Sequence, residues 1–300
     1  MKKVLRTPRW LYLLGLFWST NASMAHKLKS LLWLVYYRQW IKALYDRFQS
    51  ERLDYVLKLH PCLPFMFRMK AYILKKVSSD FILQRLVGHY QNLHRYFGQQ
   101  GVAAIHADGL ILGESEIVGH KIQIVLQYID CMSQEGQASV KLLLDKDIFY
   151  YAHIHFYDDA LWVGGFQGCP NQMEAYRRFT KISMGMRPHN FMYLILTLIA
   201  KRLNLSGIYA VSGAHHYYQK KQRTMQQVQF GYDAFWSELG GRLMQDSIWF
   251  FMPTVYPRKN IIDIPSKKRS QYNQRYAIID QVSADILGER DISAHAVKVV

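Results

Sequence analysis

Cysteine is scarce in this 300-residue chain, and its spacing excludes two kinds of protein. The three cysteines, Cys62, Cys131 and Cys169, lie far apart and form no C-x-x-C pair. They provide neither a disulfide framework nor a cysteine-rich zinc site, and they fit a reducing compartment. We identify no other set of metal ligands. Half of the residues are apolar, which is enough for a large buried core.

Long hydrophobic runs are also missing. The longest internal run, 191–200, has ten residues and contains Thr197, whereas a membrane-spanning helix needs roughly 20. The N-terminus joins basic residues to an apolar run from Trp10 to Trp18, as a signal peptide does. Because basic and aromatic residues continue directly after that run, we expect a cytoplasmic protein, peripheral to the inner membrane through a surface helix. Cleavage within residues 1–25 is the alternative.

Acidic residues are few in two segments. Residues 1–75 contain 14 Lys and Arg against 3 Asp and Glu, and residues 255–276 contain 6 against one. The rest of the chain carries 18 of each sign, so these two segments account for the net charge of +16. Basic segments with Trp, Leu and Tyr suit an anionic membrane surface, and a solvated basic surface is the simpler alternative. Zinc-finger spacing, ribonucleoprotein motifs and a clear helix-turn-helix are absent, so nucleic acid is not an expected partner.

The first hundred residues have helical periodicity. From residue 27 to about 100, apolar residues recur three and four apart. The two prolines of HPCLPF interrupt this pattern, and Ser78, Ser79 or Asp80 could cap the helix that follows.

Beyond residue 101 the period changes to that of strands. Four segments joined by short polar turns predict an antiparallel meander: 120–130, 137–146, 148–158 and 160–168. Further along, we expect two helices, a strand, a short helix closed by two glycines, a second strand and a basic tail broken by prolines: 170–184, 187–204, 207–212, 231–241, 247–253 and 255 onward.

This order predicts an α+β fold, with N-terminal helices followed by a mainly antiparallel central sheet and flanking helices. We divide the chain into a basic helical region, an α+β core domain and a C-terminal tail: 1–100, 101–280 and 281–300.

Two stretches could bind an anionic ligand. GGFQGCPN, residues 164–171, places three glycines at a strand end, where they suit a bulge and turn or the close approach of a ligand. TKISMGMRPHN, residues 180–190, gathers Lys181, Gly185 and Arg187 before Pro188. The free N–H groups of the next helix could bind phosphate there. The simpler interpretation is a C-cap glycine with cations that complement the helix dipole.

Histidines offer the other candidate chemistry. His153 and His155 lie on one face of a strand, which we interpret as a half-solvated face. The sequence VSGAHHYY follows a strand end, so His215 or His216 could act as a base. In YDAFWSELGG, Asp233 could cap the helix.

The basic tail has its own cluster, in SKKRSQYNQRY. These cations could clamp phosphate groups of a lipid or a cofactor: Lys267, Lys268, Arg269 and Arg275.

Ordered blocks of sequence resemble the VirK/YbjX family. GGFQG, TKISMGMRP, GIYAVSGAHH, YDAFWSELGG and KKRSQYNQRY occur in the family's order, and HPCLPF and LVGHYQNLHRYF look like its upstream blocks. The likeness covers roughly residues 30 to 280. It implies a bacterial protein of undefined biochemistry, with LapB-like membrane-associated relatives. The family is linked to virulence, antimicrobial-peptide resistance and display of outer-membrane proteins. It supplies no catalytic residues.

A weaker resemblance concerns the order of elements, which looks like that of the GNAT acyltransferases. In that fold, a turn after the fourth strand binds a pyrophosphate at a helix N-terminus. GGFQGCPN has this place, whereas Lys181 and Arg187 come one helix later, which puts acyl-CoA binding in doubt.

Two hypotheses of function follow. The first is an acyl or aminoacyl transferase at the inner membrane face, using an acyl-CoA or aminoacyl donor and an envelope lipid or protein as substrate. Donor phosphates would lie among four residues: Gln167, Gly168, Lys181 and Arg187. His215 or Glu238 would be the base and Tyr232 the proton donor. The second is a non-enzymatic, membrane-associated accessory for outer-membrane protein display.

Overall fold

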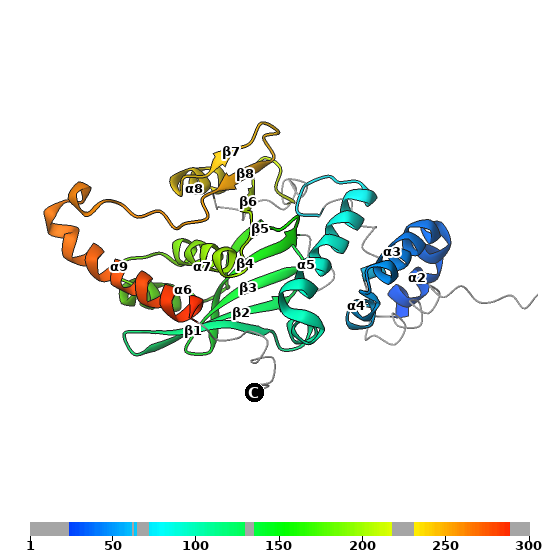
Figure 1. Ribbon diagram of the computed structural model, residues 1–300, viewed down its shortest axis with the longest axis horizontal. Helices are drawn as coiled ribbons and strands as arrows, with labels where there is room; N and C mark the ends of the chain where they lie inside the picture. Colours follow the sequence, from blue (N-terminus) through cyan, green and yellow to red (C-terminus); the bar gives the residue numbers. More distant parts are fainter. Residues whose placement is uncertain (1–23, 62, 65–71, 130–134, 218–230, 289–300) are drawn as a thin grey trace, which may run out of the picture.

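The protein forms one mixed sheet flanked by helices. The computed structural model describes residues 24–61, 63–64, 72–129, 135–217 and 231–288. Within these residues, eight strands form a single sheet in the order β1-β2-β3-β4-β5-β6-β8-β7 (Figure 1). Neighbouring strands are antiparallel except β5 and β6, which are parallel. The bounds are β1 (Leu110–Ile117), β2 (His120–Tyr128), β3 (Ala138–Leu144), β4 (Asp147–Tyr157), β5 (Ala160–Gly168), β6 (Gly207–Val211), β7 (Arg242–Leu243) and β8 (Trp249–Met252).

Along the chain, helices come before the first strand, connect some of the strands and follow the last strand. They are α2 (Met24–Tyr36), α3 (Arg38–Ser50), α4 (Asp54–Leu59), α5 (Ser79–His106), α6 (Met173–Ile182), α7 (Pro188–Arg202), α8 (Tyr232–Glu238), the 3₁₀ helix η4 (Ile261–Asp263) and α9 (Ser266–Leu287). No helix among the described residues is long and apolar enough to cross a membrane.

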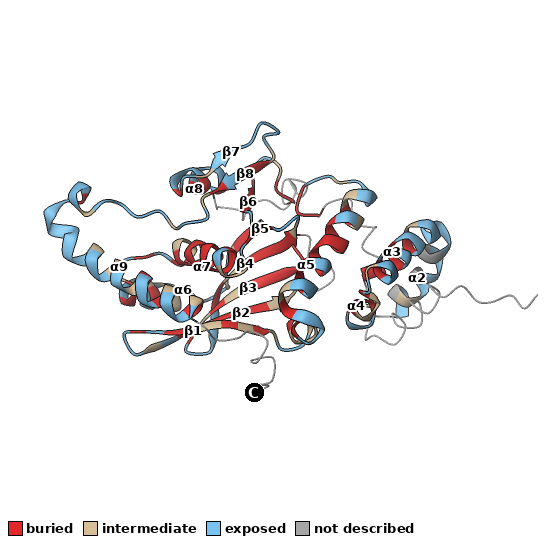
Figure 2. Ribbon diagram, viewed as in Figure 1, coloured by how far each residue is buried: buried red, intermediate tan, exposed pale blue. Residues whose placement is uncertain are grey.

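Helices cover the two faces of the sheet. The long α5 lies on one side, and α6, α7 and α9 lie on the other (Figure 1). β4 contacts helices on both sides, since Tyr157 meets Gly88 of α5 while Phe149 packs on Phe179 of α6. The strand has an extra residue at Phe149, where the pairing with β3 shifts register, so Phe149 and Tyr157 do not follow simple alternation. The inner parts of the sheet and of α7 are buried (Figure 2), and a single apolar core extends from Ile41 to Ile286.

Most of the expected elements are confirmed. The fold is α+β, and β2 to β5 form the predicted antiparallel meander. Ser78 caps α5, since its hydroxyl accepts a hydrogen bond from the Phe81 N–H at 3.1 Å. Gly240 and Gly241 close α8, because Gly240 has a φ of 84° and the Gly241 N–H donates to the Trp236 carbonyl at 2.8 Å.

Other elements differ from the expectation. The sequence analysis missed β1, β7 and α9, placing α9 within a broken basic tail and a C-terminal tail. Ile279, Val282 and Ile286 of α9 are buried against the core, a three-and-four spacing that was readable in the sequence. The boundaries at 100 and 280 fall inside α5 and α9, and the domain division itself stays a prediction.

The cap predicted for Asp233 is wrong. The N-cap of α8 is Gly231. The Asp233 carboxylate instead accepts a hydrogen bond from the Gly213 N–H at 2.7 Å, which fixes the turn after β6.

The stretch 180–190 forms the turn between α6 and α7. Gly185 has a φ of 80°, and its N–H donates to the Thr180 carbonyl at 2.7 Å, as in a glycine C-cap. Arg275 of α9 donates to the Met184 carbonyl through Nε at 3.0 Å and Nη2 at 2.7 Å. A cation therefore completes the end of α6 from a distant part of the chain, and Pro188 starts α7 as expected.

Candidate functional site

A short segment after β2 lies directly on strands β4 and β5. A Cβ on Gly164 would lie 1.7 Å from the Glu135 carbonyl oxygen, and a Cβ on Gly136 would lie 2.6 Å from the Ile154 carbonyl oxygen. Gly164 is also the extra residue of a bulge, because His153 pairs with Gly165 and Ile154 pairs with Val163. The glycines of GGFQG therefore admit a close approach, and the group that approaches is the chain's own backbone.

This crossing buries the carboxyl group of Glu135 between two histidines. The side chain is only 6% exposed. One of its oxygens lies 3.4 Å from Nε2 of His153, and the other lies 3.4 Å from Nε2 of His216. Gln167 donates a hydrogen bond from Nε2 to the oxygen that faces His153, at 2.5 Å. We call these four residues, together with Tyr232, the Glu135 cluster.

Tyr232 joins the cluster from α8. Its ring stacks on that of His216, with centroids 4.8 Å apart. Its hydroxyl oxygen accepts a hydrogen bond from the Phe166 N–H at 3.1 Å. β5 pairs with β6 only from Ala160 to Val163, so the hydroxyl replaces a strand partner where β5 continues beyond β6.

The surroundings favour a neutral imidazole at His153. Burial lowers the pKa of His153 below its ordinary value, Glu135 opposes that shift, and Lys141 and His216 add to it. A neutral imidazole can accept a proton, and Glu135 beside it would stabilise the cation that results. The cluster thus has the parts of an acid–base device.

The three predicted catalytic residues do not meet in one place. Tyr232 belongs to the Glu135 cluster, but His215 is half-buried and its Nδ1 lies 3.1 Å from the Ser212 hydroxyl. Glu238 is exposed at the end of α8. Burial and then Arg187 lower the pKa of His189, and Glu238 opposes that shift. His216 takes the buried position, one residue from the histidine that the sequence analysis preferred.

The predicted phosphate ligands are likewise separated. Gln167 and Gly168 precede α6, whereas Lys181 and Arg187 are exposed at its far end. α6 has ten residues, so its ends are roughly 15 Å apart. Gly168 lies against α6, since a Cβ there would meet the Tyr176 hydroxyl at 2.1 Å.

The predicted basic clamp lies at the start of α9. Lys267, Lys268 and Arg269 are exposed. The guanidinium of Arg269 donates to the carbonyls of Ile264, at 2.9 Å, and Ile262, at 3.2 Å. Arg269 thus closes the loop before α9, and whether the two lysines bind a ligand stays a prediction.

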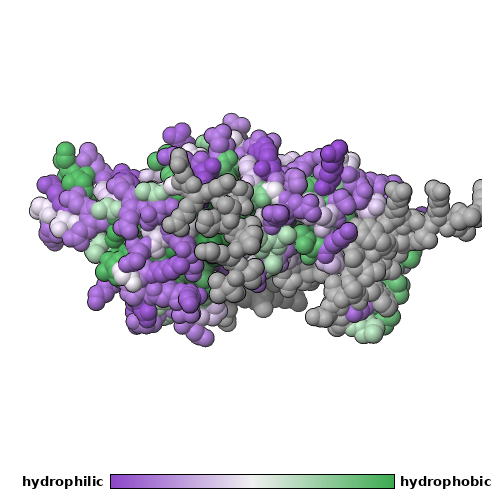
Figure 3. Space-filling model, turned by 60° about the horizontal axis from the view of Figure 1, so that its bottom comes forward, coloured by the Kyte–Doolittle hydropathy of each residue, from purple (hydrophilic) through white to green (hydrophobic). Residues whose placement is uncertain are grey.

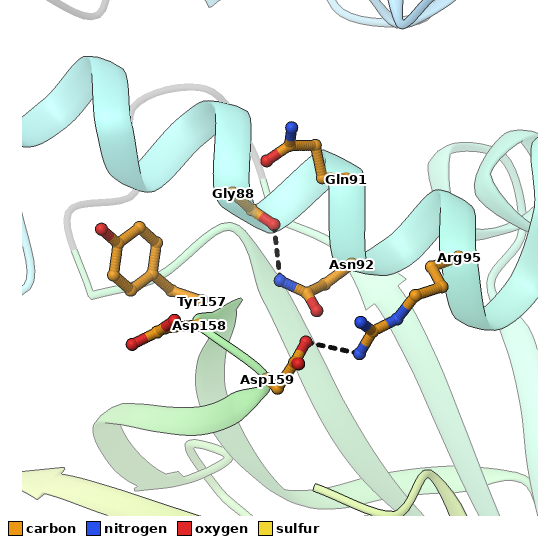
Figure 4. A pocket seen from close by; sticks show the side chains of 7 residues that line it. All are labelled: Gly88, Gln91, Asn92, Arg95, Tyr157, Asp158 and Asp159. Carbon is orange, nitrogen blue, oxygen red and sulfur yellow. Dashed lines mark hydrogen bonds and ion pairs between the residues drawn. The ribbon is translucent and has the colours of Figure 1, made fainter. Parts of the chain in front are cut away.

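Two surface pockets lie outside the cluster. One, of about 560 Å³, is lined by residues of α6, the 183–187 turn and α9, among them Lys181 and Gly185. The other, of about 400 Å³, lies between α5 and the β4–β5 turn (Figure 4). There Arg95 and Asp159 are 2.5 Å apart as an ion pair, and Asn92 donates to the Gly88 carbonyl. Neither pocket is lined by a residue of the Glu135 cluster.

The α5 side of the sheet buries further histidines. Burial lowers the pKa of His89 to about 3 and that of His106 to about 4. It also holds the pKa values of His60 and His155 well below the ordinary value. His155 lies under Arg85, whose guanidinium stacks 4.1 Å from the Trp162 ring. The expectation of a half-solvated histidine strand is therefore wrong, since His153 is 8% exposed and His155 is 0% exposed.

Sequence reasoning missed the centre of the site. Glu135 lies in a connection that was interpreted only as a polar turn. Two glycines at 164 and 165 were the available signal, because adjacent glycines inside a strand indicate that another backbone lies close. In the described part of the chain, no group of three or more His, Cys, Asp or Glu is arranged to hold a metal ion.

The fold and the site define an α+β protein with a buried carboxyl–histidine cluster at the edge of a parallel strand pair. The profile of the family described as "Protein of unknown function (DUF535)" matches residues 20–287, and the chain belongs to this family, VirK/YbjX.

Named relatives agree with this assignment. The uncharacterized protein YbjX of Escherichia coli is 26% identical over 242 residues, which cover 77% of this chain and 72% of the relative. Two uncharacterized proteins of Haemophilus influenzae are 35% and 25% identical over 130 and 170 residues. Those matches cover 42% and 55% of this chain and 42% and 56% of the relatives. No solved structure matches the chain.

Proposed function

We propose that this protein is an acyl or aminoacyl transferase that modifies a component of the bacterial envelope. The observation that carries the proposal is the Glu135 carboxyl group, buried within 3.4 Å of two imidazoles beside the Tyr232 hydroxyl. A buried ionisable group with a specific charge partner is a candidate for a functional site. The resemblance to VirK/YbjX proteins supports the envelope context.

The strand order supports a GNAT-like mode of transfer. β5 and β6 are parallel, α6 and α7 connect them, and two antiparallel strands follow in the order β8-β7. β5 runs on past its last pair with β6 as far as Gly168. A donor chain placed between the separating strands would bring its acyl group to the level of Phe166, next to Tyr232.

The cluster supplies a base and an acid for this reaction. His153 or His216 takes a proton from the acceptor amine, and the amine nitrogen forms a bond to the acyl carbon. The bond from that carbon to the sulfur of a thioester donor breaks, and the sulfur receives the proton of the Tyr232 hydroxyl. The proton taken up by the imidazole then passes to the tyrosinate, which restores both groups. Glu135 contacts both histidines, so we assign it the role of a positioning residue that stabilises the protonated imidazole.

Neighbouring histidines provide a matched test. His216→Asn removes the imidazole beside Glu135, whereas His215→Asn removes one that bonds to Ser212. We expect His216→Asn and Glu135→Gln to lower the rate of acetyl transfer from acetyl-CoA to a soluble amine by at least about 100-fold. His215→Asn should retain the wild-type rate. Aminoacyl donors are tested in parallel.

The binding of donor is measured separately. Acetyl-CoA at about 100 times its Kd should stabilise the fold by roughly 2.7 kcal/mol, in the wild type and in Glu135→Gln alike. Absence of both a melting shift and any transfer, with folded protein and either class of donor, contradicts the proposal. Equal rates for the two histidine variants contradict a role of His216 in the reaction, and an unchanged rate in Glu135→Gln contradicts the assignment of the site.

The second candidate is a non-enzymatic accessory for outer-membrane protein display. Its support is that the two pockets described above lie away from the Glu135 cluster, as expected if the buried groups only hold the strands together. It predicts that Glu135→Gln lowers the melting temperature while cells that carry it keep their resistance to antimicrobial peptides.

A further inference from the structure

The first helix of the described chain exposes its apolar residues. Met24, Leu28, Leu31, Leu32 and Val35 of α2 are 64%, 54%, 41%, 60% and 68% exposed. Their spacing of four, three, one and three residues places them on one face of the helix. We call these five residues the α2 stripe. Figure 3 shows apolar surface at the end of the molecule formed by α2 to α4.

The next helix shows that this exposure is not general. α3 also has an apolar face, and its four residues there are buried: Ile41, Leu44, Tyr45 and Phe48. Phe48 packs on Tyr90 of α5, with ring centroids 5.9 Å apart. α3 thus attaches the N-terminal helices to the body, while the α2 stripe points away from the core.

Positive charge accompanies the stripe. Residues 24–50 contain five Lys and Arg and a single acid, Asp46. α2 itself has no acidic residue. Arg38, Lys42 and Arg47 of α3 are exposed. An apolar helix face with basic neighbours is complementary to an anionic lipid surface, where acyl chains accept the apolar side chains and headgroups the cations.

The dimensions of α2 decide how it would meet a bilayer. Its 13 residues extend roughly 20 Å, whereas the hydrocarbon core is about 30 Å thick. The helix is therefore too short to cross and would lie in the plane of the interface.

We propose that the α2 stripe docks the protein on an anionic membrane surface, with Arg38 and Lys42 beside it. This goes beyond the transfer reaction, because it depends on α2 and α3 and on no residue of the Glu135 cluster. It would bring the cluster to envelope lipids and to proteins anchored among them.

Vesicle co-sedimentation with the full-length protein tests the proposal. One set of vesicles contains about three parts phosphatidylethanolamine to one part phosphatidylglycerol, as an anionic surface, and the other contains phosphatidylcholine alone. We expect binding to the first set and little to the second. Leu28→Gln with Leu32→Gln should weaken it about tenfold or more, and Arg38→Glu with Lys42→Glu should do the same.

A matched control removes apolar surface elsewhere. Val118 in the β1–β2 turn is 66% exposed, and Val118→Asn should bind as the wild type does. Three results overturn the proposal: no sedimentation with anionic vesicles, equal sedimentation with both vesicle types, or undiminished binding of the leucine double variant. If that undiminished binding comes with a lower melting temperature of the leucine double variant, another part of the chain covers the stripe. Transfer to a soluble amine should be unaffected by the leucine changes.

Discussion

Glu135 packs so closely on Gly164 that the single methyl group added by Gly164→Ala tests the contact. In Gly164→Ala, the new Cβ would lie 1.7 Å from the Glu135 carbonyl oxygen and 2.8 Å from its carbonyl carbon. An ordinary contact starts near 3.4 Å. Since backbone atoms stand on both sides, no side chain can rotate away, and the segment must lift from the sheet.

The magnitude follows from this overlap. Inserting a methyl group into a well-packed site costs typically 1–3 kcal/mol, and the backbone clash suggests the upper end, about 3 kcal/mol. For a chain of this size, each kcal/mol lowers the melting temperature by roughly 2–4 °C, so we expect a fall of about 6–12 °C. Lifting the segment also withdraws the Glu135 carboxyl group from both imidazoles, so transfer should be lost as well.

Thermal melting monitored by circular dichroism provides the assay, and Gly213→Ala provides the control. A Cβ at Gly213 meets only the Asp233 carboxylate at 3.6 Å, an ordinary contact, and should change the melting temperature little. A Gly164→Ala protein that melts with the wild type would refute the crossing of the two segments, and with it the geometry of the site.

The remaining predictions concern pH and capping. Burial lowers the pKa of His89 to about 3. As the pH falls, the unfolded chain therefore binds a proton at this histidine before the folded chain does. The stability that neutral His89 contributes is present above about pH 6.5 and is lost as the pH falls below that value. His89 alone should lower the free energy of unfolding by about 2 kcal/mol between pH 7 and pH 5. Denaturant titrations at the two pH values measure this difference, and equal stabilities would contradict burial of a neutral His89. His106→Phe keeps a ring to stack on Tyr128, 4.4 Å away, and should flatten the pH dependence without large loss at pH 7. Arg275→Ala leaves the Met184 carbonyl without its two guanidinium hydrogen bonds and should cost about 1–3 kcal/mol. Arg258→Ala breaks an exposed ion pair with Asp280 and should lower the free energy of unfolding by less than about 1 kcal/mol. Equal losses of stability in the two arginine variants would contradict the capping of α6 by Arg275.

Local patterns in the sequence determined most of the elements. Period-two segments with polar turns predicted β2 to β5, since antiparallel hairpins need only neighbouring residues to form. Gly185 and Pro188 predicted the turn between α6 and α7, because a positive φ and a missing N–H are properties of single residues. Ordered motifs were enough to identify the family.

Tertiary structure alone decided which polar residues meet. Glu135, His153 and His216 lie far apart in the sequence, and only the order of strands and the crossing over Gly164 bring them within 3.4 Å. The choice between His215 and His216 depends on which way two adjacent side chains point after a strand end. The exposure of α2 and the burial of α3 were equally hidden, since both helices have an apolar face and only the packing against α5 shows which face is covered.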